Sequence, residues 1–130
     1  MRKYADGPLH VVDAILGVIR PGVTSAALCE IAEQAIDEIG FRQFRRSLSN
    51  AVGNEKGVYV GHRIGFSVHE YPTIQPVDEP PWLPGMCGAI EIPFGDDEIG
   101  YLQWEDNFLV TETGVEVLSI SEKELFLTGS

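Results

Sequence analysis

The hydrophobic residues of this chain are spaced in two different ways, and this difference indicates the class of fold. They recur every three or four positions from about residue 9 to 19 and again from 25 to 39, which predicts two helices. Pro8 is predicted to stand at the entry of the first helix, and Gly40 to end the second. From about residue 58 to 119 the pattern favours β-strands. Two N-terminal helices followed by antiparallel strands indicate an α+β fold, with the helices on one face of the sheet.

The second part of the chain is predicted to contain strands separated by irregular segments. Residues 86–93 and 101–111 show strand patterns, and a shorter strand is predicted near residues 66–69. Residues 72–84 include five prolines, which predicts a long loop rather than a strand or a helix. Residues 41–57 are polar and are predicted to form an irregular crossing or a loop.

The composition excludes several classes of protein. The 130 residues are 44% hydrophobic, which is typical of a single globular domain. A net charge of −11 argues against nucleic acid and anionic membranes as partners, and no apolar run is long enough to span a bilayer. Cys29 and Cys87 are interpreted as two unpaired thiols. Unpaired thiols are typical of a reducing compartment, so a cytoplasmic location is expected.

Two histidines lie close together in the segment Gly61-His62-Arg63-Ile64-Gly65-Phe66-Ser67-Val68-His69-Glu70-Tyr71-Pro72. Histidine is the most common metal ligand in proteins and the side chain that titrates nearest to neutral pH. The glycines permit a bend or a close approach of the backbone, which a binding site needs and an ordinary strand does not. Taken alone, His69 is equally consistent with a half-buried strand histidine.

Two isolated glutamates form the second half of the candidate site. Glu91 and Glu105 lie 14 residues apart around a predicted turn near Glu98, so in a hairpin they face each other across the ladder. The opposite face of this hairpin carries apolar residues suited to packing against helices, namely Met86, Ile90, Ile92, Leu102, Trp104 and Phe108. A solvated acidic hairpin and a cation site remain equal alternatives for the glutamates alone. Together with an imidazole they form a ligand set suited to Mn, Co, Fe or Zn.

Four motifs occur in order along the chain, and the first is the turn Arg20-Pro21-Gly22-Val23-Thr24. The second is Gly61-His62-x-Ile64-Gly65 with His69-Glu70-x-Pro72, and the third is Leu83-Pro84-Gly85-Met86 leading to Ile90-Glu91. The fourth is Glu105-Asp106-Asn107-Phe108-Leu109-Val110-Thr111-x-Thr113-Gly114-x-Glu116-x-Leu118. Together they resemble the pita-bread metallopeptidases, which include methionine aminopeptidase, Xaa-Pro aminopeptidase, prolidase and the metal-free creatinase. The resemblance covers about residues 4–118, and the Glu-Asp-Asn-Phe-Leu-Val-Thr run is most similar to the Xaa-Pro branch.

This resemblance implies a fold, an activity and a set of site residues. The fold would be half of a pita-bread domain with a curved sheet, and the activity that of an Xaa-Pro dipeptidase or aminopeptidase acting on proline-containing peptides. His62 and Glu91 would be ligands of a divalent metal (Mn, Co, Zn or Fe), and Glu105 would bridge two metal ions. His69 would donate a hydrogen bond to the substrate carbonyl and to the oxyanion that develops from it.

The sequence departs from the family pattern at three places. Arg63 replaces the usual middle glycine and is expected to place a cation beside the metal site, and Ile92 separates Glu91 from a proline that usually follows it directly. Family members also carry two aspartate ligands on strands before the helix pair, whereas Asp6 and Asp13 here lie before or within the first helix. The chain therefore resembles the C-terminal half of a catalytic domain, expected to bind metal weakly and to be inactive or nearly so alone.

Two other interpretations of the function remain open, and a partner is expected. The same fold can serve as a non-catalytic peptide-binding module or as a metal-free hydrolase of the creatinase type, although the retained histidines and glutamates argue against both. The sheet of a separate half-domain would expose backbone groups and apolar side chains. A homodimer that imitates the whole domain, or the missing N-terminal half, is expected to cover them.

Overall fold

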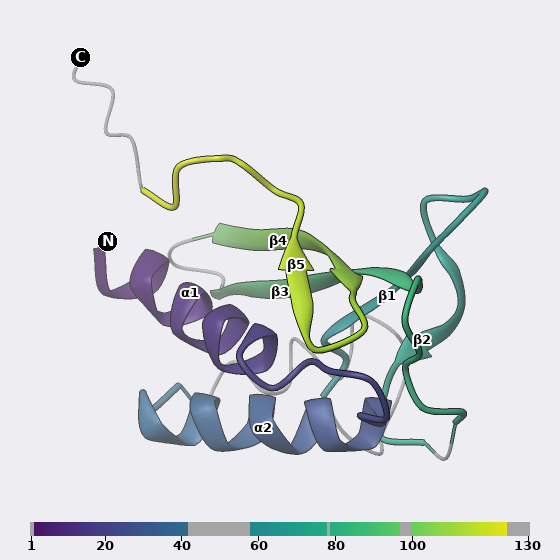
Figure 1. Ribbon diagram of the computed structural model, residues 1–130. Coiled ribbons are helices and arrows are strands. Elements are labelled where there is room, and N and C mark those ends of the chain that lie inside the picture. Colours follow the sequence, from purple (N-terminus) through teal and green to yellow (C-terminus); the bar gives the residue numbers. More distant parts are fainter. Residues whose placement is uncertain (1, 42–57, 78, 97–99, 125–130) are drawn as a thin grey trace.

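Two helices and a single sheet make up the computed structural model, which describes residues 2–41, 58–77, 79–96 and 100–124. The elements are α1 (Arg2–Leu16), α2 (Ser25–Glu38), β1 (Gly61–Ile64), β2 (Glu70–Ile74), β3 (Cys87–Asp96), β4 (Gly100–Val110) and β5 (Val115–Val117). All strand pairs are antiparallel, in the order β2-β1-β3-β4-β5, and the helices lie on one side of the sheet (Figure 1). The predicted α+β class is confirmed. The irregular segment predicted at residues 41–57 lies outside the described residues, except for its first residue, Phe41.

Helix α1 begins at Arg2 rather than near residue 9, so Pro8 lies inside it. The prediction that Pro8 marks the entry of this helix is wrong. Gly7 explains why the helix extends so far, because a side chain at this position would crowd Ile39 and Phe41 at 3.3 Å. The bare backbone of Gly7 thus allows α1 to pack closely against the end of α2, and this tertiary packing outweighs the poor helix propensity of the Gly-Pro pair.

Local hydrogen bonds define the remaining helix ends. Helix α1 ends at Leu16 rather than near residue 19, because Val18 and Ile19 bond to carbonyl groups three residues back instead of four. The side-chain oxygen of Thr24 accepts a hydrogen bond of 3.2 Å from the backbone three residues on and caps α2. Gly40, with φ of +71°, follows α2 as predicted. Neither described helix has the length and apolarity needed to cross a membrane.

The hairpin of β3 and β4 has the predicted register, with Glu91 directly opposite Glu105. Ile90 and Ile92 flank Glu91 in the strand, and both are fully buried in the core that the helices share. Because successive side chains of a strand point to opposite faces, both glutamates lie on the face turned away from the helices. The register that the sequence predicts for this hairpin is therefore confirmed.

The edge of the sheet beyond β1 differs from the prediction. No strand occurs at residues 66–69, which form a bend, and β2 begins at Glu70 instead. Pro72 lies within β2, although the proline-rich segment that it begins was predicted to be a loop. A proline is tolerated here because β2 is an edge strand with a single neighbour, β1, so the missing N–H need not disrupt the ladder.

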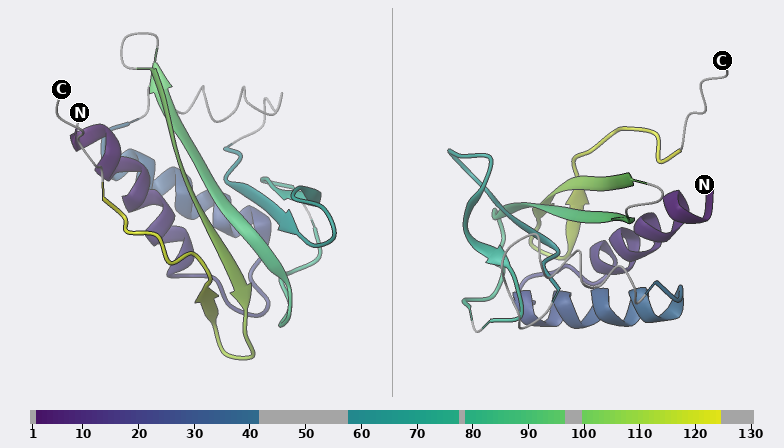
Figure 2. Two further views of the ribbon diagram at one scale, coloured as in Figure 1. Left: turned by 90° about the horizontal axis from the view of Figure 1, so that it is seen from above. Right: turned by 180° about the vertical axis from the view of Figure 1, so that it is seen from behind.

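The segment after β5 returns to the first helix. Figure 2 shows it running beside α1 in the view from above. The Nζ atom of Lys123 lies 2.8 Å from Oδ1 of Asp13 in α1 and 2.8 Å from Oδ2 of Asp106 in β4. Asp106 is buried, and Lys123 supplies the positive charge that a buried carboxylate needs. This bridge joins the C-terminal segment, the first helix and the sheet.

Candidate metal centre

The buried side chain of His62 directs its Nε2 atom toward the carboxylate of Glu91. Its side chain is 1% exposed, and Nδ1 lies 3.0 Å from the backbone oxygen of Arg63. A carbonyl oxygen only accepts hydrogen bonds, so Nδ1 carries the proton in this contact. Nε2 is then unprotonated in the neutral ring, and it lies 3.6 Å from Oε2 of Glu91. An imidazole that donates one N–H to a carbonyl and offers the other nitrogen is typical of metal-ligating histidines.

Gly61 brings β1 close enough to β3 for this contact. It has φ of +152°, and a Cβ atom there would overlap the backbone oxygen of Ala89. His62 pairs with Ala89 in the same ladder, so its side chain shares a face with Ala89 and with Glu91, two positions farther along β3. The close approach of the two backbones thus places the imidazole beside the carboxylate.

Tyr59 holds the carboxylate of Glu91. Its hydroxyl donates a hydrogen bond of 3.0 Å to Oε2 of Glu91, and the backbone oxygen of Val60 accepts one of 2.9 Å from the Glu91 N–H. Burial and then the negative charge of Glu91 raise the pKa of Tyr59 far above its ordinary value, and the charge of Glu105 adds to this. Tyr59 therefore remains a donor at neutral pH. This role of Tyr59 was not predicted, because in the sequence it is only a single hydroxyl in an apolar run.

His69 lies over His62, although it belongs to the bend between β1 and β2. The two ring centroids are 4.1 Å apart with an interplanar angle of 38°. Glu70 shapes this bend, because its Oε1 atom accepts a hydrogen bond of 3.1 Å from the backbone of Ser67. A side chain at Gly65 would overlap the Glu70 carboxylate, so a substitution there would have to displace the end of this glutamate side chain. The bend therefore places the exposed ring of His69 next to the buried ring of His62.

Three of the four predicted site residues come together. His62, His69 and Glu91 each offer one ligand atom, and these atoms all lie within 4.8 Å of one another. Glu105 faces Glu91 from β4 but is exposed and does not belong to this group. Two imidazoles and a carboxylate form a donor set that suits Zn, Fe, Mn or Co. The residues present thus fit a divalent metal ion chemically.

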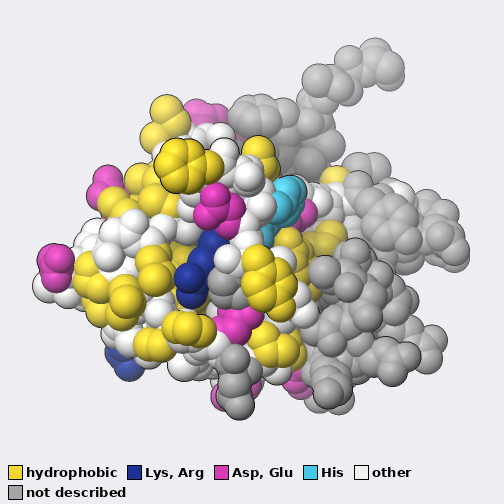
Figure 3. Space-filling model, turned by 90° about the vertical axis from the view of Figure 1, so that its right-hand side faces the viewer, with side chains coloured by type: hydrophobic (Ala, Val, Ile, Leu, Met, Phe, Trp, Pro, Cys, Tyr) yellow, Lys and Arg dark blue, Asp and Glu magenta, His cyan; other side chains and the backbone are white. Residues whose placement is uncertain are grey.

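Arg63 does not lie beside this cluster, and the expectation that it would do so is wrong. It pairs with Gly88, and its guanidinium carbon lies 5.1 Å from the ring centroid of the buried Trp82. Its Nη2 atom is 3.4 Å from the backbone oxygen of Pro80. Since Arg63 directly follows His62 in β1, the two side chains point to opposite faces of the sheet. In Figure 3 the surfaces of basic side chains and of histidine are separate patches.

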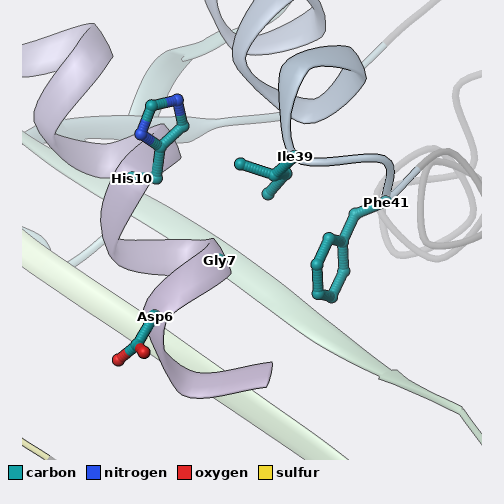
Figure 4. Close-up of a pocket in the computed structure, with 5 residues that line it drawn as sticks. All are labelled: Asp6, Gly7, His10, Ile39 and Phe41. Carbon is teal, nitrogen blue, oxygen red and sulfur yellow. The ribbon is translucent and has the colours of Figure 1, made fainter. Parts of the chain in front are cut away.

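A pocket elsewhere in the molecule contains another histidine. It is lined by Asp6, Gly7, His10, Ile39 and Phe41. In Figure 4 the side chains of Ile39 and Phe41 point toward α1, whereas the carboxylate of Asp6 points away from them. The Nε2 atom of His10 lies 3.2 Å from Oε2 of Glu38. This exposed contact links the two helices, and the residues that line the pocket include no second histidine.

Comparisons with known proteins give these residues a family context. Residues 1–112 match the model of metallopeptidase family M24. The chain is 34% identical over 107 residues to an Xaa-Pro dipeptidase of Pyrococcus horikoshii, an alignment that covers 82% of this chain and 27% of that protein.

Solved structures show the same fold. The prolidase of Pyrococcus horikoshii OT3 has a TM-score of 0.78 and 27% identity, over 96% of this chain and 33% of the prolidase chain. The X-Pro aminopeptidase of Thermotoga maritima has a TM-score of 0.81 and 23% identity, over 98% of this chain and 33% of the other, a likeness of fold alone. The chain thus spans only about a quarter to a third of these relatives. The family match extends over most of its length, so the chain belongs to metallopeptidase family M24.

Proposed function

We propose that this chain forms part of a metal-dependent peptide hydrolase of the Xaa-Pro dipeptidase or aminopeptidase type. The observation that carries this proposal is the convergence of His62, His69 and Glu91, whose ligand atoms lie within 4.8 Å of one another. The 34% identity to an Xaa-Pro dipeptidase supports the proposal that the substrate is a proline-containing peptide. A single domain of this kind would correspond to the C-terminal half of the catalytic domain.

Each site residue has a proposed role. His62 and Glu91 would hold a divalent metal ion, and Glu105, which faces Glu91 across the ladder, would be a further ligand of the complete site. Such a metal would polarise the peptide carbonyl and lower the pKa of a bound water molecule. His69 donates a hydrogen bond to the substrate carbonyl oxygen and to the negative charge that develops there. The Tyr59 hydroxyl orients the Glu91 carboxylate.

We further propose that the chain is inactive or nearly so by itself. Family members use two additional aspartate ligands, and the aspartates of α1 do not supply them: Asp13 is bonded to Lys123, and Asp6 is absent from the described cluster. Fewer carboxylate ligands bind a divalent ion more weakly, so dinuclear occupancy is expected to be low. Tight binding of two Mn or Co ions per chain in a calorimetric titration would contradict this.

A chimera tests the activity. The matching segment of the Pyrococcus horikoshii Xaa-Pro dipeptidase would be replaced with this chain, and hydrolysis of Xaa-Pro dipeptides measured with Mn or Co. We expect hydrolysis by the chimera, none or little by the chain alone, and a loss of about 100-fold or more with His62→Ala. A folded chimera that binds peptide without hydrolysing it would instead support the non-catalytic peptide-binding module.

The proposed partner is a second copy of this chain, with an N-terminal half of the catalytic domain as the alternative. Three apolar side chains near His69 are strongly exposed: Phe66, Val68 and Tyr71 at 110%, 72% and 85%. Apolar side chains grouped in this way are usually covered by a partner. Light scattering at high protein concentration and moderate salt is expected to give the mass of a dimer. A monomer under these conditions would exclude self-association.

We propose a cytoplasmic location, supported by the two cysteines. Both are free thiols in the structure. Burial, with smaller contributions from nearby glutamates, raises the pKa of Cys29 to about 12, so this thiol is unreactive at neutral pH. Free thiols of this kind are compatible with a reducing compartment.

A further inference from the structure

We infer that Arg63 is a positioning residue: its side chain, anchored on the helix side of the sheet, fixes the backbone oxygen that orients the ring of His62 on the opposite side. The inference rests on the proposed function only in that His62 acts in the site, and it assigns no metal ligand. It gives a role to the arginine that stands where the family pattern usually has a glycine, and which the proposed function leaves unused.

The link between the two residues is a hydrogen bond to the backbone. Nδ1 of His62 donates to the backbone oxygen of Arg63 at 3.0 Å, so the direction of that oxygen sets the orientation of the ring. The ladder from β1 to β2 changes register at this point, because His62 pairs with Thr73 whereas Arg63 pairs with Glu70. A neighbouring strand that changes register holds the peptide unit less regularly than an unbroken ladder does. The orientation of the Arg63 carbonyl therefore depends on further contacts.

The side chain of Arg63 supplies such contacts. Its guanidinium carbon lies 5.1 Å from the centroid of the Trp82 ring, which is a cation–π arrangement, and its Nη2 atom is 3.4 Å from the backbone oxygen of Pro80. Burial raises the pKa of Glu79 and the charge of Arg63 opposes this, so the two side chains also attract each other. All three partners of Arg63 belong to one short segment, residues 79–82.

Trp82 is a firm anchor for the guanidinium. It is fully buried, and its backbone N–H donates a hydrogen bond of 2.8 Å to Val23 in the turn between the two helices. Its ring lies 5.1 Å from that of Phe108 between centroids. A Cβ atom built at Gly88, the partner of Arg63 in β3, would meet the Trp82 ring at 2.7 Å. An arginine stacked on this ring is therefore tied to the core.

Stability alone does not favour this contact. Among the described residues, the buried side-chain atoms without a hydrogen-bond partner include Nε of Arg63, Oε2 of Glu79 and Nε1 of Trp82. Buried polar atoms are normally paired, and each unpaired one lowers the free energy of unfolding. Local arrangements that reduce stability in this way are typical of functional positions. The oxygen that Arg63 holds in place explains the arginine better than a stabilising role does.

The tautomer of His62 in the metal-free chain tests the inference. ¹⁵N NMR of the ring nitrogens distinguishes a proton on Nδ1 from one on Nε2, and is recorded at about pH 8.5, where an ordinary imidazole is neutral. We expect the Nδ1–H form in the unaltered chain. Arg63→Ala should give a mixture of both forms, because the acceptor is no longer held, and a Zn²⁺ affinity lower by about 10-fold or more. Arg63→Lys, which keeps a cation over Trp82, should restore the Nδ1–H form.

Arg20→Ala is the matched control, because Arg20 is an exposed arginine outside the sheet, and it should leave the tautomer unchanged. A purely structural role of Arg63 would lower the urea midpoint and leave the tautomer of the folded chain as it is. The inference is overturned if Arg63→Ala keeps the Nδ1–H form, if a folded Arg63→Lys fails to restore it, or if Arg20→Ala also changes it. Should Arg63→Ala not fold, Arg63→Met, which fills similar space without the charge, must give the mixture in a folded chain, or the inference fails.

These outcomes are distinct from those that test the proposed function. Hydrolysis by the chimera, together with an unchanged tautomer in Arg63→Ala, overturns the inference alone. An inactive chimera, together with the mixture of tautomers in Arg63→Ala, overturns the proposed function, whereas the positioning of the His62 ring by Arg63 stands.

Discussion

Replacing Gly61 with alanine is expected to destabilise the chain by about 3–5 kcal/mol, a large part of the about 5–15 kcal/mol that stabilises a typical domain. The new Cβ atom would overlap the backbone oxygen of Ala89 and approach the Cα atom of Ile90 at 3.2 Å. Backbone atoms cannot rotate away as a side chain can, so β1 and β3 must separate. Alanine also rarely adopts the φ of +152° found at this position. The urea midpoint of unfolding measures this loss of stability.

Gly22→Ala is the matched control for Gly61→Ala. Gly22 has φ of +90°, but no atom lies within 4 Å of a Cβ built there. Alanine at this position therefore suffers backbone strain without a clash, and the expected cost is about 1–2 kcal/mol. Equal losses for the two variants would show that the close approach of β1 to β3 is unimportant. A larger loss for Gly61→Ala should be accompanied by weaker metal binding, since His62 would move away from Glu91.

Replacing Glu91 with glutamine is expected to weaken metal binding and to stabilise the metal-free chain. Metal affinity should fall by more than about 100-fold, because glutamine does not supply the negatively charged carboxylate oxygen that a divalent ion prefers. Glutamine can still accept the hydrogen bond from Tyr59, so the local structure should persist. The free energy of unfolding should rise by about 0.2–1 kcal/mol, since Glu91 and Glu105 are like charges directly opposite each other.

Glu105→Gln separates the two effects. It removes the same repulsion, so the gain in stability should be similar to that of Glu91→Gln, whereas the loss of metal affinity should be far smaller. Unfolding in urea with a chelator measures the first effect, and a Zn²⁺ titration of each variant measures the second. If the Glu91→Gln variant binds Zn²⁺ with the same affinity as the unaltered chain, Glu91 is not a ligand of the metal.

The elements that depend on local patterns could be predicted from the sequence. Alternation of side chains and a single turn suffice to place Glu91 opposite Glu105, and Gly40 suffices for the end of α2. The start of α1 could not be predicted, because it depends on Gly7 meeting residues after α2. Pro72 falls in a strand only because that strand lies at the edge of the sheet, and strand order is not visible in local sequence.

The candidate site shows the same division between local and long-range information. The residue types of His62, His69 and Glu91 indicate a site, and the resemblance to a family assigns them roles. Tyr59 acts on Glu91 across 32 positions of sequence, and no local pattern reports such a contact. Arg63 was expected next to the metal site because it is adjacent to His62 in sequence. In a strand, adjacent residues point to opposite faces, and this strand could not be delimited before the fold was known.

The bridge from Lys123 to Asp13 joins residues 110 positions apart and bears on how the chain folds over time. Contacts between residues so far apart are slow to form, because the chain must lose entropy before the contact becomes favourable. This bridge also needs both α1 and β4 in place, since Lys123 bonds to each of them. Contacts made after the rate-limiting step leave the folding rate unchanged and slow unfolding. We therefore expect the C-terminal segment to lengthen the lifetime of the native state without hastening its formation.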